Sequence, residues 1–185
     1  MNLFLFFKEL YTQLFEKVSI VNEKNEVTGS MARIFSFLFK KSHRGVNVLI
    51  FKDDTCKEIL IEKRQWWMRF PLKKGDCSGA VPFPLSYEQT AYKEIHEELF
   101  YNRALPKISL KKIAEFKDTT ASPFIWSQVF IGVYPGPFSP SFFEVRGLKF
   151  ISIEKIKSDL NHPKESRKYS PSFREAFRHF VRISS

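Results

Sequence analysis

Glutamate side chains form the clearest chemical pattern in this sequence. Glu94, Glu97 and Glu98 lie in one short segment whose apolar residues have helical spacing. At about 100° per residue, the three carboxylates fall within an arc of roughly 100° on one helix face. Carboxylates held that close repel each other at neutral pH, and a hard divalent cation, which prefers oxygen ligands, would relieve the repulsion. The alternative is an acidic helix face that is simply solvated.

The segment around these glutamates carries the signals of a helix with a defined start. Ser86 can act as the N-cap, and Gln89, three residues later, completes a capping box. An apolar stripe with i, i+4 and i+8 spacing follows, formed by Ala91, Ile95 and Leu99. The pattern predicts a helix that begins after Ser86, continues to Phe100 and holds the carboxylates beside its apolar stripe.

The loop before this helix, taken together with the glutamates, resembles the Nudix box. That pattern runs Gly, five residues, Glu, seven residues, Arg-Glu, an aliphatic residue, any residue, Glu-Glu, any residue, Gly. The positions that match are Gly79, Glu94, Ile95, Glu97 and Glu98. Three positions depart from it: Leu85 stands for the first Glu, Lys93 for Arg and Phe100 for the final Gly.

The resemblance implies an α/β fold, namely a Nudix-like α/β/α sandwich with a mixed β-sheet. It also implies a metal-dependent hydrolase of a diphosphate linkage in a nucleotide-type or related small molecule. Glu94, Glu97 and Glu98 would then be catalytic residues and, with Gly79, the site of Mg²⁺ (or Mn²⁺). Gly79 would let backbone approach the metal, since no Cβ stands in the way. Metal ions neutralise phosphoryl oxygens and acidify an attacking water, as diphosphate cleavage requires.

The departures from the box leave two other functions open. One is a catalytically weakened Nudix-fold binding module, because Leu85 can neither tie the loop to the helix nor assist a metal site. The other is an isopentenyl-diphosphate-isomerase-like enzyme, since residues 18–178 are similar to that branch. The isomerase's catalytic cysteine would fall at Ser78, its metal-binding histidine at Ala80 and its second acid near Ile125. These residues count against isomerisation, because protonating an alkene carbon needs a positioned acid.

Basic and aromatic side chains supply candidates for substrate binding. Arg44 lies in a long stretch without acidic residues, which phosphate contact or protection of a sheet edge would explain. Lys63 and Arg64 are followed closely by two adjacent tryptophans, and aromatic rings beside cations could stack on a base or a prenyl group. We predict Arg44, Lys63, Arg64 and Trp67 as substrate-binding residues, the alternative being tryptophans that fill the core.

Composition bounds the class of protein and its partners. The chain has 185 residues, of which 43% are hydrophobic, and a net charge of +10. Such a charge favours anionic partners, either a small-molecule diphosphate or a nucleic acid, although no nucleic-acid-binding motif is recognised. Cys56 and Cys77 make no disulfide framework, and reduced thiols indicate a cytoplasmic protein. No apolar run approaches the length of a membrane span.

The order of the predicted elements indicates one domain. Residues 1–17 should form an amphipathic N-terminal helix, either docked on the domain or available to an interface or partner, and residues 18–185 a single Nudix-like domain. Ser152 should cap a helix through Leu160, a loop should follow, and Ser170 with Pro171 should open the last helix. Extended segments are predicted at residues 18–21, 26–28, 33–39, 45–51, 58–63, 108–115, 125–134 and 147–151.

Overall fold

The computed structural model describes residues 3–119 and 123–184 of the chain. The helices are α1 (Leu3–Phe15), α2 (Arg33–Leu38), α3 (Tyr87–Glu94), the π-helical turn η1 (Ile95–Leu99), α4 (Ile153–Asn161), α5 (Pro163–Ser166) and α6 (Pro171–Ser184). The strands are β1 (Lys17–Val21), β2 (Val27–Ala32), β3 (His43–Phe51), β4 (Glu58–Arg64), β5 (Lys74–Gly75), β6 (Cys77–Ala80), β7 (Lys111–Asp118), β8 (Ile125–Val133) and β9 (Val145–Ser152).

Strand β3 is the centre of a mixed sheet. It is buried along nearly its whole length, as expected for an apolar run that is covered on both faces. It pairs in parallel with β8 from end to end and antiparallel with β6, while β7 continues the sheet on the outer side of β8. Strand β4 meets β3 at the single pair Phe51–Ile59 and then diverges to pair with β9. The β1–β2 hairpin joins β3 at its other end, where Ile20 pairs with His43.

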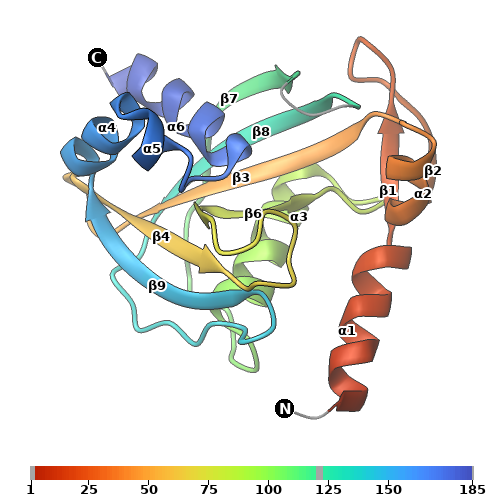
Figure 1. Ribbon diagram of the computed structural model, residues 1–185, viewed down its shortest axis with the longest axis horizontal. Coiled ribbons are helices and arrows are strands. Elements are labelled where there is room, and N and C mark those ends of the chain that lie inside the picture. The colour runs from red at the N-terminus through yellow and green to blue at the C-terminus, as the bar shows by residue number, and fades with distance from the viewer. Residues whose placement is uncertain (1–2, 120–122, 185) are drawn as a thin grey trace.

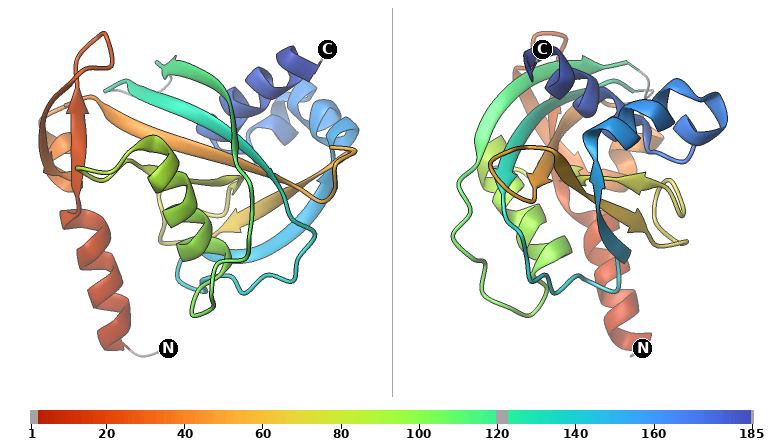
Figure 2. Two further views of the ribbon diagram at one scale, coloured as in Figure 1. Left: turned by 180° about the vertical axis from the view of Figure 1, so that it is seen from behind. Right: turned by 90° about the vertical axis from the view of Figure 1, so that its left-hand side faces the viewer.

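Helices cover both faces of this sheet (Figures 1 and 2). Side chains alternate along β3, so Val46 and Val48 face α3 while Leu49 and Phe51 face α4 and α6. The α3 side is covered by the apolar stripe of the helix formed by α3 and η1, which we call the box helix. The other side is covered by the phenylalanines of α6. The α/β/α sandwich predicted from the sequence is confirmed.

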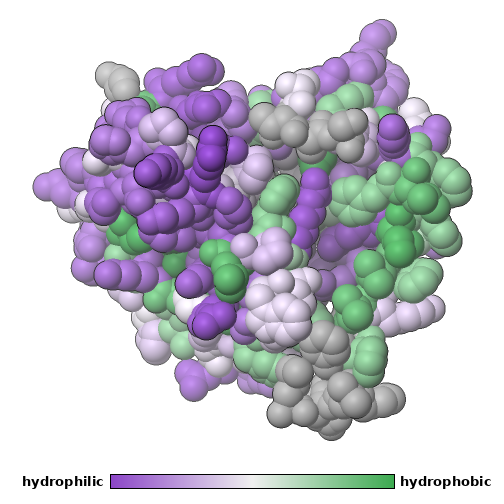
Figure 3. All heavy atoms as spheres, in the orientation of Figure 1, coloured by the Kyte–Doolittle hydropathy of each residue, from purple (hydrophilic) through white to green (hydrophobic). Residues whose placement is uncertain are grey.

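Helix α1 projects from the sandwich rather than packing along it (Figure 1). Its last turn meets α2, where the rings of Phe15 and Phe35 lie 6.5 Å apart. Exposed aromatic residues on both helices form the hydrophobic area that Figure 3 shows over α1 and α2. The helix lies within residues 1–17, and Asn2, which the sequence offers as a possible N-cap, falls outside the described residues. No helix in the described part of the chain has both the length and the apolar character needed to cross a membrane.

Three element predictions are corrected by the structure. Residues 33–39 are predicted to be extended, yet Arg33–Leu38 form α2, because packing against α1 overrides the strand preference of aromatic residues. The strand predicted at residues 108–115 spans Lys111–Asp118 instead. The residues after Asn161, predicted as a loop, include the short helix α5. The caps at Ser152 and Ser170 are formed, since their hydroxyls accept from the N–H groups of Lys155 and Phe173.

Candidate functional site

The box helix begins where the sequence predicts. The Gln89 N–H donates to Ser86 Oγ at 3.1 Å, and the Ser86 N–H donates to Gln89 Oε1 at 2.9 Å. This reciprocal capping box satisfies two backbone donors at the start of α3. The cap therefore fixes the entry of the helix that carries the three glutamates.

The end of the box helix differs from the prediction, because a π-helical turn replaces its last α-helical turn. The turn η1 spans Ile95–Leu99, and its wider i→i+5 bonding changes the face on which each side chain lies. Phe100 ends it with φ −130°, so this position does not use the left-handed conformation that a glycine would favour. Its ring is buried instead and packs edge-to-face against Tyr134 at 5.2 Å.

Gly79 and Glu94 form a close pair across the sheet and the box helix. Gly79 lies on β6 opposite Val46 of β3. A Cβ built on Gly79 would lie 2.3 Å from Glu94 Cδ and Oε1. The Glu94 carboxylate thus occupies the space that any other residue at position 79 would need, which gives the glycine a physical role in placing this glutamate.

Buried carboxylates converge on this region from four parts of the chain. Glu62 on β4, Asp76 before β6, and Glu94 and Glu98 of the box helix are 2%, 1%, 6% and 0% exposed. Glu144, just before β9, joins them because its charge acts on Glu62 and Glu98. We call these five residues the carboxylate cluster.

Hydrogen bonds satisfy only part of the carboxylate cluster. The Ser78 N–H donates to Glu98 Oε2 at 3.1 Å, and Asn47 donates to Asp76 Oδ2 at 2.9 Å. Glu62 Oε2, Asp76 Oδ1 and Glu98 Oε1 are buried and have no hydrogen-bond partner among the described residues. Buried polar atoms are nearly always paired in folded proteins, so three such oxygens in one region call for a cationic or protonic partner.

Burial and mutual repulsion shift the titration of the cluster. Burial, then the charge of nearby carboxylates, raises the pKa of Glu62 to about 8. Burial likewise raises the pKa of Glu94 to about 8 and that of Asp76 to about 7, and it raises the pKa of Glu98 well above its usual range. The isolated cluster therefore holds protons that a divalent cation would displace.

Glu97 is more exposed than the buried carboxylates, although its charge acts on Glu94 and Glu144. Its side chain is 45% exposed and pairs with Lys93 Nζ at 2.5 Å. Lys93 also contacts Glu16 Oε1 at 3.3 Å, and Glu16 in turn pairs with Arg33 at 3.2 Å. The three box glutamates differ in burial: Glu94 and Glu98 are buried together, while Glu97 sits at the rim. Among the described residues, no group of three acidic, histidine or cysteine side chains is arranged to hold a metal ion in this conformation.

Arg64 is the predicted substrate-binding residue that lies with the carboxylate cluster. Its guanidinium donates to Glu62 Oε1 at 3.3 Å. Lys63 is exposed and, because side chains alternate along a strand, points away from Glu62 and Arg64. The side chains of Lys63 and Arg64 therefore lie on opposite faces of β4.

Arg44 and Trp67 each contact residues that are not members of the carboxylate cluster. Arg44 stacks over the Tyr87 ring at 5.1 Å, and its Nε donates to Asn25 at 2.9 Å, which ties the β1–β2 turn to α3. Trp67 is half-buried and donates through Nε1 to the Phe143 carbonyl at 2.8 Å. Their role in substrate binding stays a prediction.

Sequence reasoning did not select several charged residues of this region. Glu62, Asp76 and Glu144 lie far from the box in sequence, although a glutamate after three apolar strand residues is a signal that could have indicated Glu62. Sequence reasoning also left out Arg33 and Arg69. Burial and the charges of Arg64 and Arg33 lower the pKa of Arg69, and the charges of Arg64 and Arg33 in turn act on Glu62 and Glu94.

Comparisons with known proteins place this geometry in a known fold. No protein-family model and no curated protein sequence matches the chain. Protein DR0079 from Deinococcus radiodurans superposes with a TM-score of 0.67 at 22% identity, over 79% of this chain and 89% of that chain. A MutT protein from Methanosarcina mazei superposes with a TM-score of 0.59 at 20% identity, over 78% of this chain and 96% of that chain.

A third similar structure is the Nudix domain of Shewanella oneidensis NrtR, solved with ADP-ribose. It superposes with a TM-score of 0.59 at 12% identity, over 84% of this chain and 100% of that domain. At these identities the likeness shows the fold. The chain has the Nudix fold, and the carboxylate cluster lies around its box helix.

Proposed function

We propose that this protein is a metal-dependent hydrolase of a diphosphate linkage in a nucleotide-type or related small molecule. The proposal rests on a cluster of buried carboxylates placed around the box helix of a Nudix fold. Cationic side chains act on the same carboxylates, namely Arg33, Arg64 and Lys93. Carboxylates for metal ions beside cations for phosphate oxygens form the combination that diphosphate hydrolysis requires.

The observation that carries the proposal is the set of three buried carboxylate oxygens without partners. They belong to Glu62, Asp76 and Glu98, which come from three separate parts of the chain. An all-oxygen donor set suits Mg²⁺ or Mn²⁺, so the residues present fit the metal in chemistry. Glu94 and Glu98 would hold it, and Glu97 would join them after leaving Lys93. A bound ion would neutralise phosphoryl charge and acidify the attacking water.

The protein's own residues have distinct parts in this proposal. Gly79 leaves room for the Glu94 carboxylate, and the Ser78 N–H orients Glu98 through one of its oxygens. Arg64 opposes the charge of the cluster and presents an Nε that has no partner in the described structure, which could bind a phosphate oxygen. Arg44, Lys63 and Trp67 remain in the proposal as outer contacts to the substrate.

A screen of diphosphate compounds with Mg²⁺ and with Mn²⁺, assayed for phosphate or nucleotide release, tests the function. Glu98→Gln and Glu97→Gln keep side-chain size and remove charge, so each should reduce hydrolysis by orders of magnitude. Glu88→Gln is the matched control, because Glu88 is an exposed glutamate in the first turn of α3. Hydrolysis by Glu98→Gln at the unmutated rate would show that the metal site is assigned wrongly.

A non-catalytic binding module is the second candidate. Two observations favour it: Leu85 stands where the box has its first Glu, and Glu97 is held outside the buried cluster by Lys93. ADP-ribose is a suitable probe, because the Nudix domain of NrtR was solved with it. Saturable binding of ADP-ribose without turnover in Mg²⁺ or Mn²⁺ would support the module, whereas release of products would support the hydrolase.

A further inference from the structure

A basic pocket lies between α4 and α6, on the side of the sheet away from the box helix. Its volume is about 460 Å³, within the size range of small-molecule sites. Leu160, Phe177 and Val181 supply apolar walls, and Asn161 and Ser166 supply hydrogen-bonding groups. Four cations complete the lining: Lys157, Arg174, Arg178 and Arg182.

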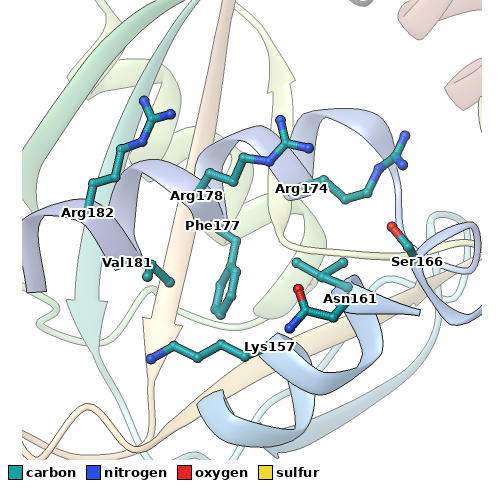
Figure 4. Close-up of a pocket in the computed structure, with 9 residues that line it drawn as sticks. Lys157, Asn161, Ser166, Arg174, Phe177, Arg178, Val181 and Arg182 are labelled. Atoms are coloured by element: carbon teal, nitrogen blue, oxygen red, sulfur yellow. The ribbon is translucent and has the colours of Figure 1, made fainter. Parts of the chain in front are cut away.

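The three arginines form one row along α6 (Figure 4). They are spaced four residues apart, which places neighbours on one helix face a single turn from each other. Lys157 and Asn161 come from α4 on the other side of the pocket, and Ser166 lies at the end nearest Arg174 (Figure 4). The three guanidinium groups extend on the side of α6 away from Lys157 (Figure 4), so the arginine row forms one basic edge of the pocket and Lys157 lies across from it.

Most of this positive charge is uncompensated. Arg178 pairs with Glu175, but in the described part of the chain no carboxylate pairs with Lys157, Arg174 or Arg182. Two nearby acids are engaged elsewhere, since Asp159 binds Lys155 and Glu165 binds Lys168. Arg174 Nε is also buried without a hydrogen-bond partner among the described residues. Like charges gathered around a cavity repel one another, and an anionic ligand would relieve that cost.

The pocket is separate from the carboxylate cluster. Phe177 belongs to the core between the sheet and α6, whereas Glu94 and Glu98 flank the core that α3 covers. The hydrophilic area over α4 to α6 is seen on the left of Figure 3, away from α1 and α2. Hydrolysis at the carboxylate cluster does not require this second set of cations.

We propose that the pocket binds a small molecule through a diphosphate or triphosphate group. Three unpaired cations match the charge of such a group near neutral pH, and arginine forks bind phosphate oxygens in pairs. A volume of about 460 Å³ suits a small molecule. Inorganic polyphosphate and the phosphates of a nucleotide share this chemistry, and the row on α6 recognises the phosphates in either case.

Calorimetric titration of the full-length protein in EDTA tests the proposal, because EDTA removes metal-dependent phosphate binding at the carboxylate cluster. The probes are inorganic tripolyphosphate, ATP and adenosine, at about 0.15 M salt to screen distant charges. We expect saturable binding of tripolyphosphate and ATP and none of adenosine. The double variant Arg174→Gln, Arg182→Gln should weaken binding by about tenfold or more, since each arginine contributes charge-assisted hydrogen bonds. Tighter binding of ATP than of tripolyphosphate would identify a nucleotide as the source of the phosphates.

The matched control is Lys107→Gln, Lys111→Gln, which removes two exposed cations outside the pocket. It should change affinity less than twofold. Equal weakening in both double variants, or no saturable binding of either phosphate probe, would overturn the proposal. A single-stranded oligonucleotide that binds more tightly than tripolyphosphate and is lost in the arginine variant would also overturn it, in favour of a nucleic-acid surface. Loss of hydrolysis in Glu98→Gln with tripolyphosphate binding unchanged would separate the two sites.

Discussion

The carboxylate cluster should make the metal-free protein less stable as pH rises. Burial raises the pKa of Asp76 from 3.8 to about 7 and that of Glu94 from 4.5 to about 8. At pH values between the ordinary pKa and the raised pKa of each group, the folded state therefore binds more protons than the unfolded chain. The free energy of unfolding falls as pH increases through this range. The stability that protonation provides is complete near pH 4 and is lost by about pH 8.

The size of this loss follows from the shift at one residue. Each pKa unit corresponds to about 1.4 kcal/mol, so the Asp76 shift alone implies roughly 4 kcal/mol against the charged form. Its neighbours share the same repulsion, so their contributions do not add in full. For a domain of this size about 1 kcal/mol changes the melting temperature by roughly 2–4 °C, which predicts a fall of roughly 10 °C between pH 5 and pH 8 in EDTA.

Magnesium should restore the lost stability at pH 8 but not at pH 5. A ligand at one hundred times its Kd stabilises the folded state by about 2.7 kcal/mol, or roughly 5–10 °C here. At pH 5 protons compete for the same oxygens, so the effect should be small. Differential scanning fluorimetry with EDTA or MgCl₂ at both pH values measures this directly.

Glu98→Gln provides the control for this experiment. The amide keeps an oxygen to accept from the Ser78 N–H and removes one buried ionisable group. The variant should melt higher than the unmutated protein at pH 8 in EDTA and should gain little from Mg²⁺. A melting temperature that rises from pH 5 to pH 8 in EDTA, or an equal Mg²⁺ effect at both pH values, would refute the reasoning.

Two further predictions concern the placement of the box helix. Gly79→Ala puts a methyl group 2.3 Å from Glu94 Cδ, so metal-dependent hydrolysis should fall by orders of magnitude, whereas Gly147→Ala, where nothing lies within 4 Å, should leave it unchanged. Equal activity in both variants would show that Glu94 moves freely. Ser86→Ala should lower the free energy of unfolding by about 0.5–2 kcal/mol in urea titrations, since it removes the bond to the Gln89 N–H. An unchanged midpoint and slope would mean that the cap contributes nothing.

Local signals predicted the parts of the fold that depend on local structure. The capping box at Ser86 and Gln89 and the buried strand from residue 45 to 51 follow from neighbouring residues alone. Helix α2 does not, because its aromatic side chains favour a strand until α1 supplies a packing surface. The pairing of β4 with β9 rather than along β3 likewise depends on tertiary contacts that no local pattern contains.

The candidate site was predicted only in part, because some of its residues are brought together by tertiary contacts. Glu94 and Glu98 were identified because they share a helix with a recognisable box. Glu62 and Asp76 reach the same region only through the sheet, where β4 and the segment before β6 bring them within range of the box helix. A helical wheel drawn at the α-helical angle per residue does not describe a π-helical turn. The greater exposure of Glu97 could therefore not be predicted from the sequence.

The departures from the box lie around the carboxylates rather than among them. Phe100 replaces a glycine, and its ring packs against Tyr134. The end of the helix is therefore fixed by side-chain packing and not by a left-handed glycine. Lys93 replaces an arginine and still makes two ion pairs, one of them to Glu97. A lysine makes these contacts without the fixed fork of a guanidinium, so Glu97 is held by a flexible partner that the proposed metal ion would displace. Leu85 is the one departure with no charge to replace the lost Glu, and it lies in the turn before the cap, outside the buried cluster. The chain thus retains the buried carboxylates on which the proposed metal site depends, and the substitutions change how the box helix is anchored.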